Sequence, residues 1–171
     1  MIQAYKDHHP DIHPSAWVHP SAVIIGRARI AQDANIWPNT TIRADEAPVI
    51  IGEGTNLQDG SVIHMTGGMS QTTIGARVTI GHQCLLHGCI IEDDCLIGMG
   101  SIIMDNAVIG RGSFIGAGTL ITPNKVIPPN SFVRGRPYEI VRECGEREAQ
   151  WIAYSWKHYV ENSKVYADSE K

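Results

Sequence analysis

The hydrophobic residues of this chain follow a six-residue period over most of its length. Isoleucine, leucine or valine returns at every sixth position from Ile12 to Val133, with three changes of frame. A fixed short period is the signature of a repeat architecture, in which each unit buries its apolar side chain against the next unit. These aliphatic positions, called grid positions below, are 12, 18, 24, 30, 36, 42, 51, 57, 63, 74, 80, 86, 91, 97, 103, 109, 115, 121, 127 and 133.

The other positions of each hexad agree with a short strand followed by a turn. Four places after a grid residue the side chain is almost always small, as at Ala22, Ser61 and Cys84, and Lys125 is the exception. Glycine or alanine often follows the grid residue directly, which suits a tight corner. Three hexads make one triangular coil, and coils stack at the strand spacing of about 4.8 Å. The pattern therefore predicts a mainly β fold, a parallel β-helix of hexapeptide repeats over residues 12–137.

The segments outside the repeat are short. Residues 1–11 are predicted to be an N-terminal extension. Beyond residue 137 the six-residue period stops, and from about residue 146 the apolar residues fall at a helical spacing, at positions 152, 156, 159 and 160. Residues 138–171 are therefore expected to hold a C-terminal helix, packed along the prism, and a tail.

Composition places the chain among ordinary globular proteins. Apolar residues make up 43% of the 171 residues, charged residues 19%, and the net charge is -4. A negative net charge does not indicate binding to nucleic acid. Neither a basic and apolar leader nor an apolar run of about 18 residues is present, so we expect no membrane association and a cytoplasmic location. The four cysteines form no CxxC pair and are interpreted as reduced packing residues.

The period is interrupted three times. Three residues are added between Ile42 and Ile51, five between Ile63 and Ile74, and one is removed between Leu86 and position 91. The second insertion makes a loop over residues 65–73. Loops that project from a rigid solenoid usually carry its binding function. Candidate chemistry is therefore expected at these interruptions.

Counting in hexads rather than in residues aligns polar side chains in columns. Arg43, His64 and His87 each follow a grid residue, three hexads apart, and should point outward from one face in successive coils. Asp59 and His82 form a second column near a corner. Outward directions from two faces diverge, so His82 is expected to join the other two histidines from a neighbouring chain, which predicts a trimer with metal sites between subunits. Outward histidines are also ordinary on a polar prism, so the spacing alone leaves metal binding open.

Three segments in this order resemble the gamma-class carbonic anhydrase family. Residues 36–45 resemble its W-x-x-x-x-I-R-x-D stretch, residues 54–64 its G-T-N-x-Q-D-x-x-x-x-H stretch, and residues 80–89 its G-H-x-x-x-x-H-G-C stretch. The likeness covers nearly the whole chain, and hexapeptide acyltransferases share the repeat without this set of motifs. The resemblance implies that the β-helix is left-handed.

The resemblance also implies the chemistry. His64 and His87 would bind zinc from one subunit of a homotrimer and His82 from the next, although iron(II) or cobalt(II) would suit the same ligands. Three neutral histidines leave a fourth position for water, and zinc lowers the pKa of that water to about 7. The expected reaction is the reversible hydration of carbon dioxide to bicarbonate.

Further residues take roles by the same resemblance. Gln58 is expected to hydrogen-bond the zinc water or bicarbonate. Arg43, Asp45 and Asp59 are expected to form an ion-paired cluster across the subunit interface, which either orients the site or only bridges the subunits. Tyr159 falls where family members often place a tyrosine near the site.

One departure concerns the proton route. The best-known members carry an acidic loop with a proton-shuttling glutamate, whereas residues 65–73 of this chain contain no carboxylate. Because proton export limits fast hydration, the turnover is expected to be low. Glu46 is the best remaining candidate for the shuttle, and an exposed loop carboxylate without a role is the alternative.

Three other functions remain open from the sequence. The same metal site would hydrolyse an acyl-CoA thioester if a groove lies beside it. A hexapeptide acyltransferase would use one histidine as a general base. A trimeric metal-binding protein without catalytic activity is the non-enzymatic alternative.

Overall fold

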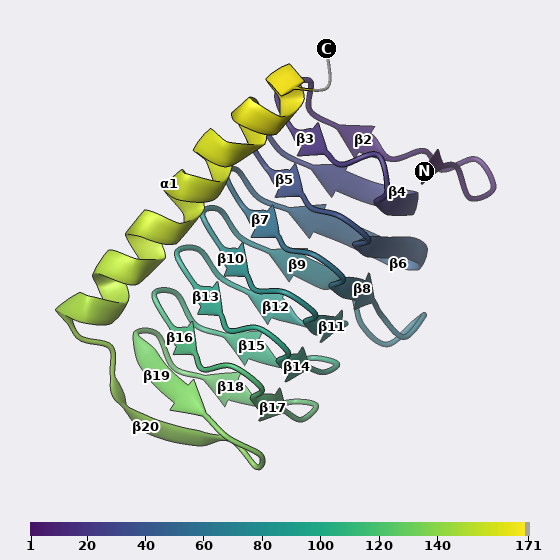
Figure 1. The fold of residues 1–171 in the computed structure, drawn as a ribbon. Helices are drawn as coiled ribbons and strands as arrows, with labels where there is room; N and C mark the ends of the chain where they lie inside the picture. The colour runs from purple at the N-terminus through teal and green to yellow at the C-terminus, as the bar shows by residue number, and fades with distance from the viewer. Residues whose placement is uncertain (170–171) are drawn as a thin grey trace.

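The chain winds into a β-solenoid of about seven turns with one C-terminal helix, as the hexapeptide pattern predicted. The computed structural model describes residues 1–169. Short parallel strands lie on three faces of a prism, and successive strands of one face come from successive coils (Figure 1). The N-terminus and the last turn of the C-terminal helix lie toward the same end of the prism.

The first face is an eight-stranded sheet. Its seven parallel strands are joined at one end by an antiparallel strand, β20 (Glu139–Glu143). The parallel strands are β3 (Trp17–Val18), β5 (Asn35–Ile36), β7 (Asn56–Leu57), β10 (Thr79–Ile80), β13 (Leu96–Ile97), β16 (Phe114–Ile115) and β19 (Ser131–Arg134).

The second and third faces share one twelve-stranded sheet, because two long strands bend around the corner between them. These are β4 (Val23–Ile30) and β6 (Thr41–Ile51). The second face continues through β8 (Val62–His64), β11 (Leu85–His87), β14 (Ile102–Ile103) and β17 (Leu120–Ile121), and β1 (Ile2–Gln3) pairs with β4 at its end. The third face holds β2 (Asp11–Ile12), β9 (Thr72–Ile74), β12 (Ile90–Ile91), β15 (Val108–Ile109) and β18 (Val126–Ile127).

The grid residues fill the prism. On the second face Ile42, Ile63, Leu86 and Ile103 pair in register from coil to coil, so the interruptions of the period leave the stacking intact. Grid positions from 24 onward are at most 1% exposed. Ile12 lies at the open end of the prism and is only partly buried. Each coil thus covers the apolar side chains of the coil before it.

The corners use two separate devices. The third residue after a grid residue usually adopts the left-handed conformation, as Asn106 does with φ 58°, and asparagine, aspartate or glycine occupies most of these positions. Glycine directly after a grid residue has another cause. A Cβ on Gly98 would lie 2.5 Å from the backbone nitrogen of Ala117 in the next coil. These glycines therefore permit close stacking of coils rather than the turn itself.

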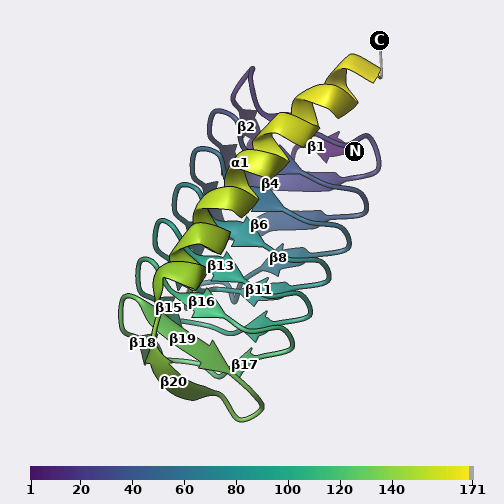
Figure 2. The ribbon, with the colours of Figure 1, turned by 60° about the vertical axis from the view of Figure 1, so that its left-hand side comes forward.

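The C-terminal helix α1 (Glu146–Ser169) lies diagonally across the first face, where it contacts β3, β5, β7 and β10 (Figures 1 and 2). Its predicted inner positions Ile152 and Val160 are buried. No helix within residues 1–169 has the length and apolar character that a membrane crossing requires.

A charged pair fixes the start of the helix. Glu148 accepts a hydrogen bond from the backbone N–H of Gly145 at 2.8 Å, which is half of a capping box. Arg142 binds both carboxylate oxygens of Glu148, at 3.0 and 2.9 Å. The hydrogen bonds from Arg142 and from the Gly145 N–H lower the pKa of Glu148 to about 2.

The first prediction concerns the core. Ile97→Ala removes a fully buried grid side chain and should lower the free energy of unfolding by about 2–5 kcal/mol. Val126→Ala, at a site 67% exposed, is the control and should change it by less than about 0.5 kcal/mol. Urea unfolding followed by tryptophan fluorescence measures both. Equal losses in the two variants would contradict the packing argument.

The second prediction concerns pH. Because folding depresses the pKa of Glu148 from 4.5 to about 2, this carboxylate stabilises the fold above pH 4.5, and the contribution is lost as the pH falls toward 2. Glu148→Gln should therefore unfold at lower urea than wild type at pH 7, with a difference that shrinks steadily below pH 4.5. Glu161→Gln, on the exposed side of α1, is the control. A difference that does not change with pH would contradict the assignment.

Candidate metal centre

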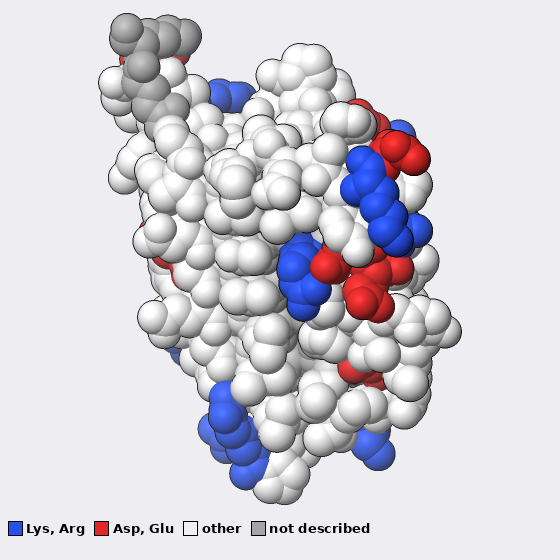
Figure 3. Space-filling view, turned by 90° about the vertical axis from the view of Figure 1, so that its right-hand side faces the viewer, with Lys and Arg blue, Asp and Glu red and all other residues white. Residues whose placement is uncertain are grey.

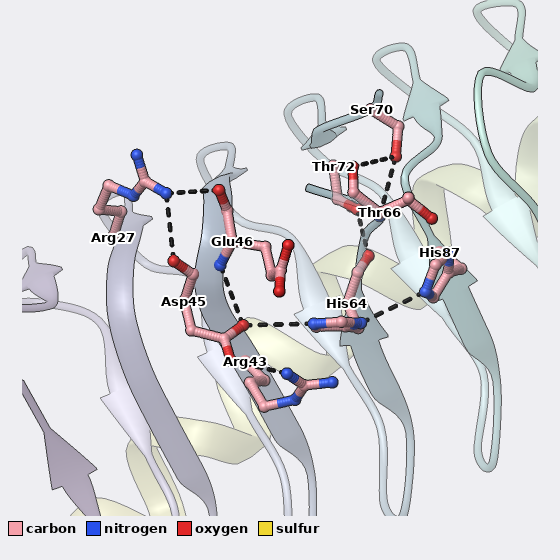
Figure 4. A network of polar contacts seen from close by, with 9 residues as sticks. All are labelled: Arg27, Arg43, Asp45, Glu46, His64, Thr66, Ser70, Thr72 and His87. Atoms are coloured by element: carbon pink, nitrogen blue, oxygen red, sulfur yellow. Dashed lines mark hydrogen bonds and ion pairs between the residues drawn. The ribbon is translucent and has the colours of Figure 1, made fainter. Parts of the chain in front are cut away.

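Two histidines from adjacent coils meet at the corner between the second and third faces. His64 ends β8 and His87 ends β11, and the two residues pair in register. Nδ1 of His64 and Nε2 of His87 lie 3.3 Å apart (Figure 4). Two nitrogen ligands at ~2.0–2.1 Å from one tetrahedral zinc ion lie about 3.3 Å from each other. The separation of these two nitrogens thus fits a shared zinc ion.

Carboxylates hold the outer nitrogens of both rings. Nε2 of His64 lies 3.2 Å from Oδ1 of Asp45, and Nδ1 of His87 lies 2.9 Å from Oδ2 of Asp105. With the ring protons on the carboxylate side, the facing nitrogens would both present lone pairs to a metal ion. Histidine ligands of metals usually donate their other ring N–H in this way, so the donor set fits zinc in its chemistry as well.

Arg43 influences the ionisation of Asp45 and His64, on one side of the histidine pair. Its Nη1 lies 2.6 Å from Oδ2 of Asp45. Burial alone would raise the pKa of Asp45, but the hydrogen bond and positive charge of Arg43 outweigh burial and bring this pKa below its usual value. Burial, followed by the charge of Arg43, lowers the pKa of His64. At neutral pH the carboxylate is therefore ionised and the imidazole neutral, as metal binding requires.

Glu46 lies in the insertion at the bend of β6. Its backbone N–H donates to Oδ1 of Asp45, and its carbonyl accepts a 2.6 Å hydrogen bond from Arg27. The carboxylate extends toward the loop that follows β8 (Figure 4). A Cβ added to Gly67 would lie only 1.7 Å from Oε2 of Glu46. The glycine thus leaves the space that this carboxylate occupies beside the histidine pair.

The loop over residues 65–73 is fastened to both histidine strands by hydroxyl groups. Thr72 is buried, donates to the carbonyl of His64 at 2.9 Å and accepts the N–H of Gly88 at 3.0 Å. Ser70 donates a short hydrogen bond to Oδ1 of Asp105. The loop without carboxylates is therefore an ordered wall of the site.

The remaining candidate residues lie at the other edge of the second face. His82 follows β10, and its Nδ1 lies 3.0 Å from Oδ2 of Asp59. Gln58 is 5% exposed and donates to Oδ1 of Asn56 at 3.0 Å. Tyr159 packs against Trp37 from α1, and burial together with the charge of Asp59 raises its pKa.

One chain thus carries two incomplete groups of candidate residues. His82 lies in the turn after β10 and His87 at the far end of β11, five residues later, a span of at most about 16 Å. No three histidine, cysteine, aspartate or glutamate side chains within residues 1–169 come together in a way that could hold a metal ion. The structure brings Arg43, Asp45, Glu46, His64 and His87 to one edge of the second face, and Gln58, Asp59, His82 and Tyr159 to the other.

Ser70 and Asp105 also belong beside His87, but they were not predicted from the sequence. A signal for Asp105 was present, because it stands two places after grid position 103, one coil beyond His87 on the same face. Ser70 carried no signal, since its place depends on how an irregular loop folds back.

The surface between the two edges is apolar in part. Val62 and Leu85 point outward from β8 and β11, and each is 36% exposed. The side of the molecule that carries the bends of β4 and β6 shows acidic and basic side chains gathered in one group beside a largely uncharged area (Figure 3). The candidate site thus adjoins a surface that suits contact with another protein chain.

The chain is similar to known proteins over nearly its full length. A family model for the bacterial transferase hexapeptide (six repeats) matches residues 88–123. A carbonic anhydrase of Geobacillus kaustophilus is 43% identical over 166 residues, which cover 97% of this chain and 91% of that protein. Protein YrdA of Escherichia coli is 41% identical over 174 residues, which cover 98% and 95%.

A solved structure has the same fold. The crystal structure of a hexapeptide transferase family protein from Anaplasma phagocytophilum matches with a TM-score of 0.93 and 37% identity, and the match covers 96% of this chain and 97% of that one. The sequence relatives and this structural match show that the chain belongs to the gamma carbonic anhydrase-like family of hexapeptide-repeat β-helices.

Proposed function

We propose that this protein is a zinc-dependent carbonic anhydrase that hydrates carbon dioxide at sites between the subunits of a homotrimer. The observation that carries the proposal is the pair of imidazole nitrogens of His64 and His87, which face each other at 3.3 Å with their outer nitrogens held by carboxylates. The relative from Geobacillus kaustophilus is named a carbonic anhydrase, which supports the same activity.

The third ligand in this proposal is His82 of a neighbouring subunit. His82 has its Nδ1 on Asp59, so its Nε2 is left to bind a metal, in the same pattern as His87, whereas His64 has its Nε2 on Asp45 and its Nδ1 toward the site. The second face has one group of candidate residues at each edge and apolar side chains between them. In a threefold ring, one edge of this face would meet the other edge on the next copy, which brings the two groups together and covers apolar side chains beside the contact.

The metal would supply a hydroxide nucleophile at neutral pH, because zinc on three neutral imidazoles lowers the pKa of a bound water to about 7. The protein's own residues would do the rest. Asp45, Asp59 and Asp105 would hold the three rings in orientation. Gln58, from the neighbouring subunit, would hydrogen-bond the reacting oxygen or bicarbonate.

Proton export would pass through Glu46. It is the carboxylate that extends toward the histidine pair without being tied to either ring (Figure 4). Gly67 gives it room to reach across the loop. The loop beside Glu46 offers hydroxyl groups but no further carboxylate. A single carboxylate would export protons more slowly than a cluster of carboxylates, so the proposal implies that turnover depends on the buffer.

Thioester hydrolysis is a second candidate activity. A hollow of about 380 Å³ opens beside the site, between the loop and β12. Its lining includes Met69 and Ile90, which are partly exposed and apolar. Such a hollow would take an acyl chain while the same metal site attacks the thioester. A panel of acyl-CoA esters, assayed on zinc-loaded protein beside carbon dioxide hydration, decides between the two substrates.

The third prediction tests the ligands. Purified wild type should hold about one zinc ion per chain and run as a trimer. His82→Ala should weaken zinc binding well beyond the ~10–100-fold that loss of an outer partner costs. His9→Ala, an exposed histidine of the N-terminal segment before the first coil, is the control. Metal analysis and analytical ultracentrifugation measure the result, and a His82→Ala protein with full zinc would refute the intersubunit site.

The fourth prediction tests proton export. In weakly buffered solution Glu46→Gln should lower carbon dioxide hydration by about 100-fold, the typical contribution of a positioned acid–base group. Added imidazole should restore the rate of the variant and raise that of wild type, because free buffer then carries the proton. Stopped-flow hydration with a pH indicator provides the measurement. A variant that stays slow in imidazole would show that Glu46 has another role.

A further inference from the structure

Asp105 connects the metal ligand His87 to the loop over residues 65–73. It follows β14, one coil beyond His87, and its side chain is 14% exposed. Oδ2 accepts the hydrogen bond from Nδ1 of His87 at 2.9 Å, and Oδ1 accepts the short hydrogen bond from the Ser70 hydroxyl. Both oxygens of one carboxylate are thus committed, one to the imidazole and one to the loop.

The Ser70 hydroxyl has a fixed direction. It accepts the backbone N–H of Thr66 at 3.1 Å, and the N–H of Ser70 donates to the carbonyl of Thr66 at 3.0 Å. Oγ of Ser70 lies 2.5 Å from Oδ1 of Asp105 but 3.5 Å from the carbonyl oxygen of Thr66, so the hydroxyl proton is directed at Asp105. The loop therefore presents an oriented donor to this carboxylate, and the side chain of Thr66 in the same loop hydrogen-bonds it as well.

Gly88 provides the space for this contact. A Cβ on Gly88, the residue after His87, would lie 2.1 Å from Oγ of Ser70 and 2.4 Å from Oδ1 of Asp105. The glycine also has φ 62°, a conformation that suits glycine. The hydrogen bond between Ser70 and Asp105 thus packs directly against the backbone of the ligand residue.

We propose that Ser70 and Asp105 are positioning residues for His87, which hold its ring with Nε2 directed at the metal. The inference rests on the proposed metal site and adds a role for the loop. In this chain a serine hydroxyl of the loop would orient the carboxylate behind a ligand. Outer partners of histidine ligands typically change metal affinity by about 10–100-fold.

Zinc affinity tests the proposal on the full-length protein. Asp105→Ala should weaken zinc binding by about 100-fold and Ser70→Ala by about 10-fold, measured by competition with a chromophoric chelator. Ser70→Thr keeps the hydroxyl and should bind within about twofold of wild type, and Asp105→Asn keeps an acceptor without its charge and should fall between Asp105→Ala and wild type. Gln71→Ala, an exposed residue of the same loop, is the matched control and should not differ from wild type.

The cobalt(II)-substituted protein gives a readout that a general loss of stability would not produce. Its visible absorption should change in Ser70→Ala and return in Ser70→Thr, because the ring of His87 shifts at the metal. Should Asp105→Ala fail to fold, Ser70→Ala decides. Tight zinc binding and an unchanged cobalt spectrum in Ser70→Ala would overturn the positioning role while the metal site stands. A wild type without zinc affinity would overturn the proposed function, and this role with it.

Discussion

The register between coils is the constraint on which the rest of the structure depends. One aliphatic side chain per strand is buried against its equivalents in the coils before and after, and this stacking resists slippage because a shift of one residue would turn the apolar side chain outward. The strand pairs Ile63–Leu86 and His64–His87 are consecutive rungs of one ladder. Packing of the core therefore sets the distance between the two imidazoles.

The insertions add chemistry without disturbing this register. The extra residues at the bend of β6 place Asp45 and Glu46 beside His64, and the loop after β8 folds back so that Thr72 connects the His64 carbonyl with the Gly88 N–H. A rigid prism with irregular corners thus separates two tasks. The strands fix the histidines, and the corners supply the carboxylates and hydroxyls that orient them.

In the proposed trimer, the division of the candidate residues between two edges of one face would make the metal site depend on assembly. Each edge has histidine held by aspartate, yet neither edge has three ligands. A site completed only between copies couples metal affinity to subunit contact, since zinc that binds two subunits together favours their association. In this scheme loss of metal and loss of assembly would accompany each other.

A six-residue period with counted interruptions maps directly onto stacked coils, so the amino-acid pattern predicts the β-solenoid, the buried positions, the C-terminal helix and the two columns of polar side chains. The groups that lie behind the imidazole rings emerge only from the folded arrangement of the loops. Asp105, Ser70 and the place of Gly67 under Glu46 depend on how irregular loops fold back across coils. Contacts of this kind follow from three-dimensional proximity, which no period in the chain encodes.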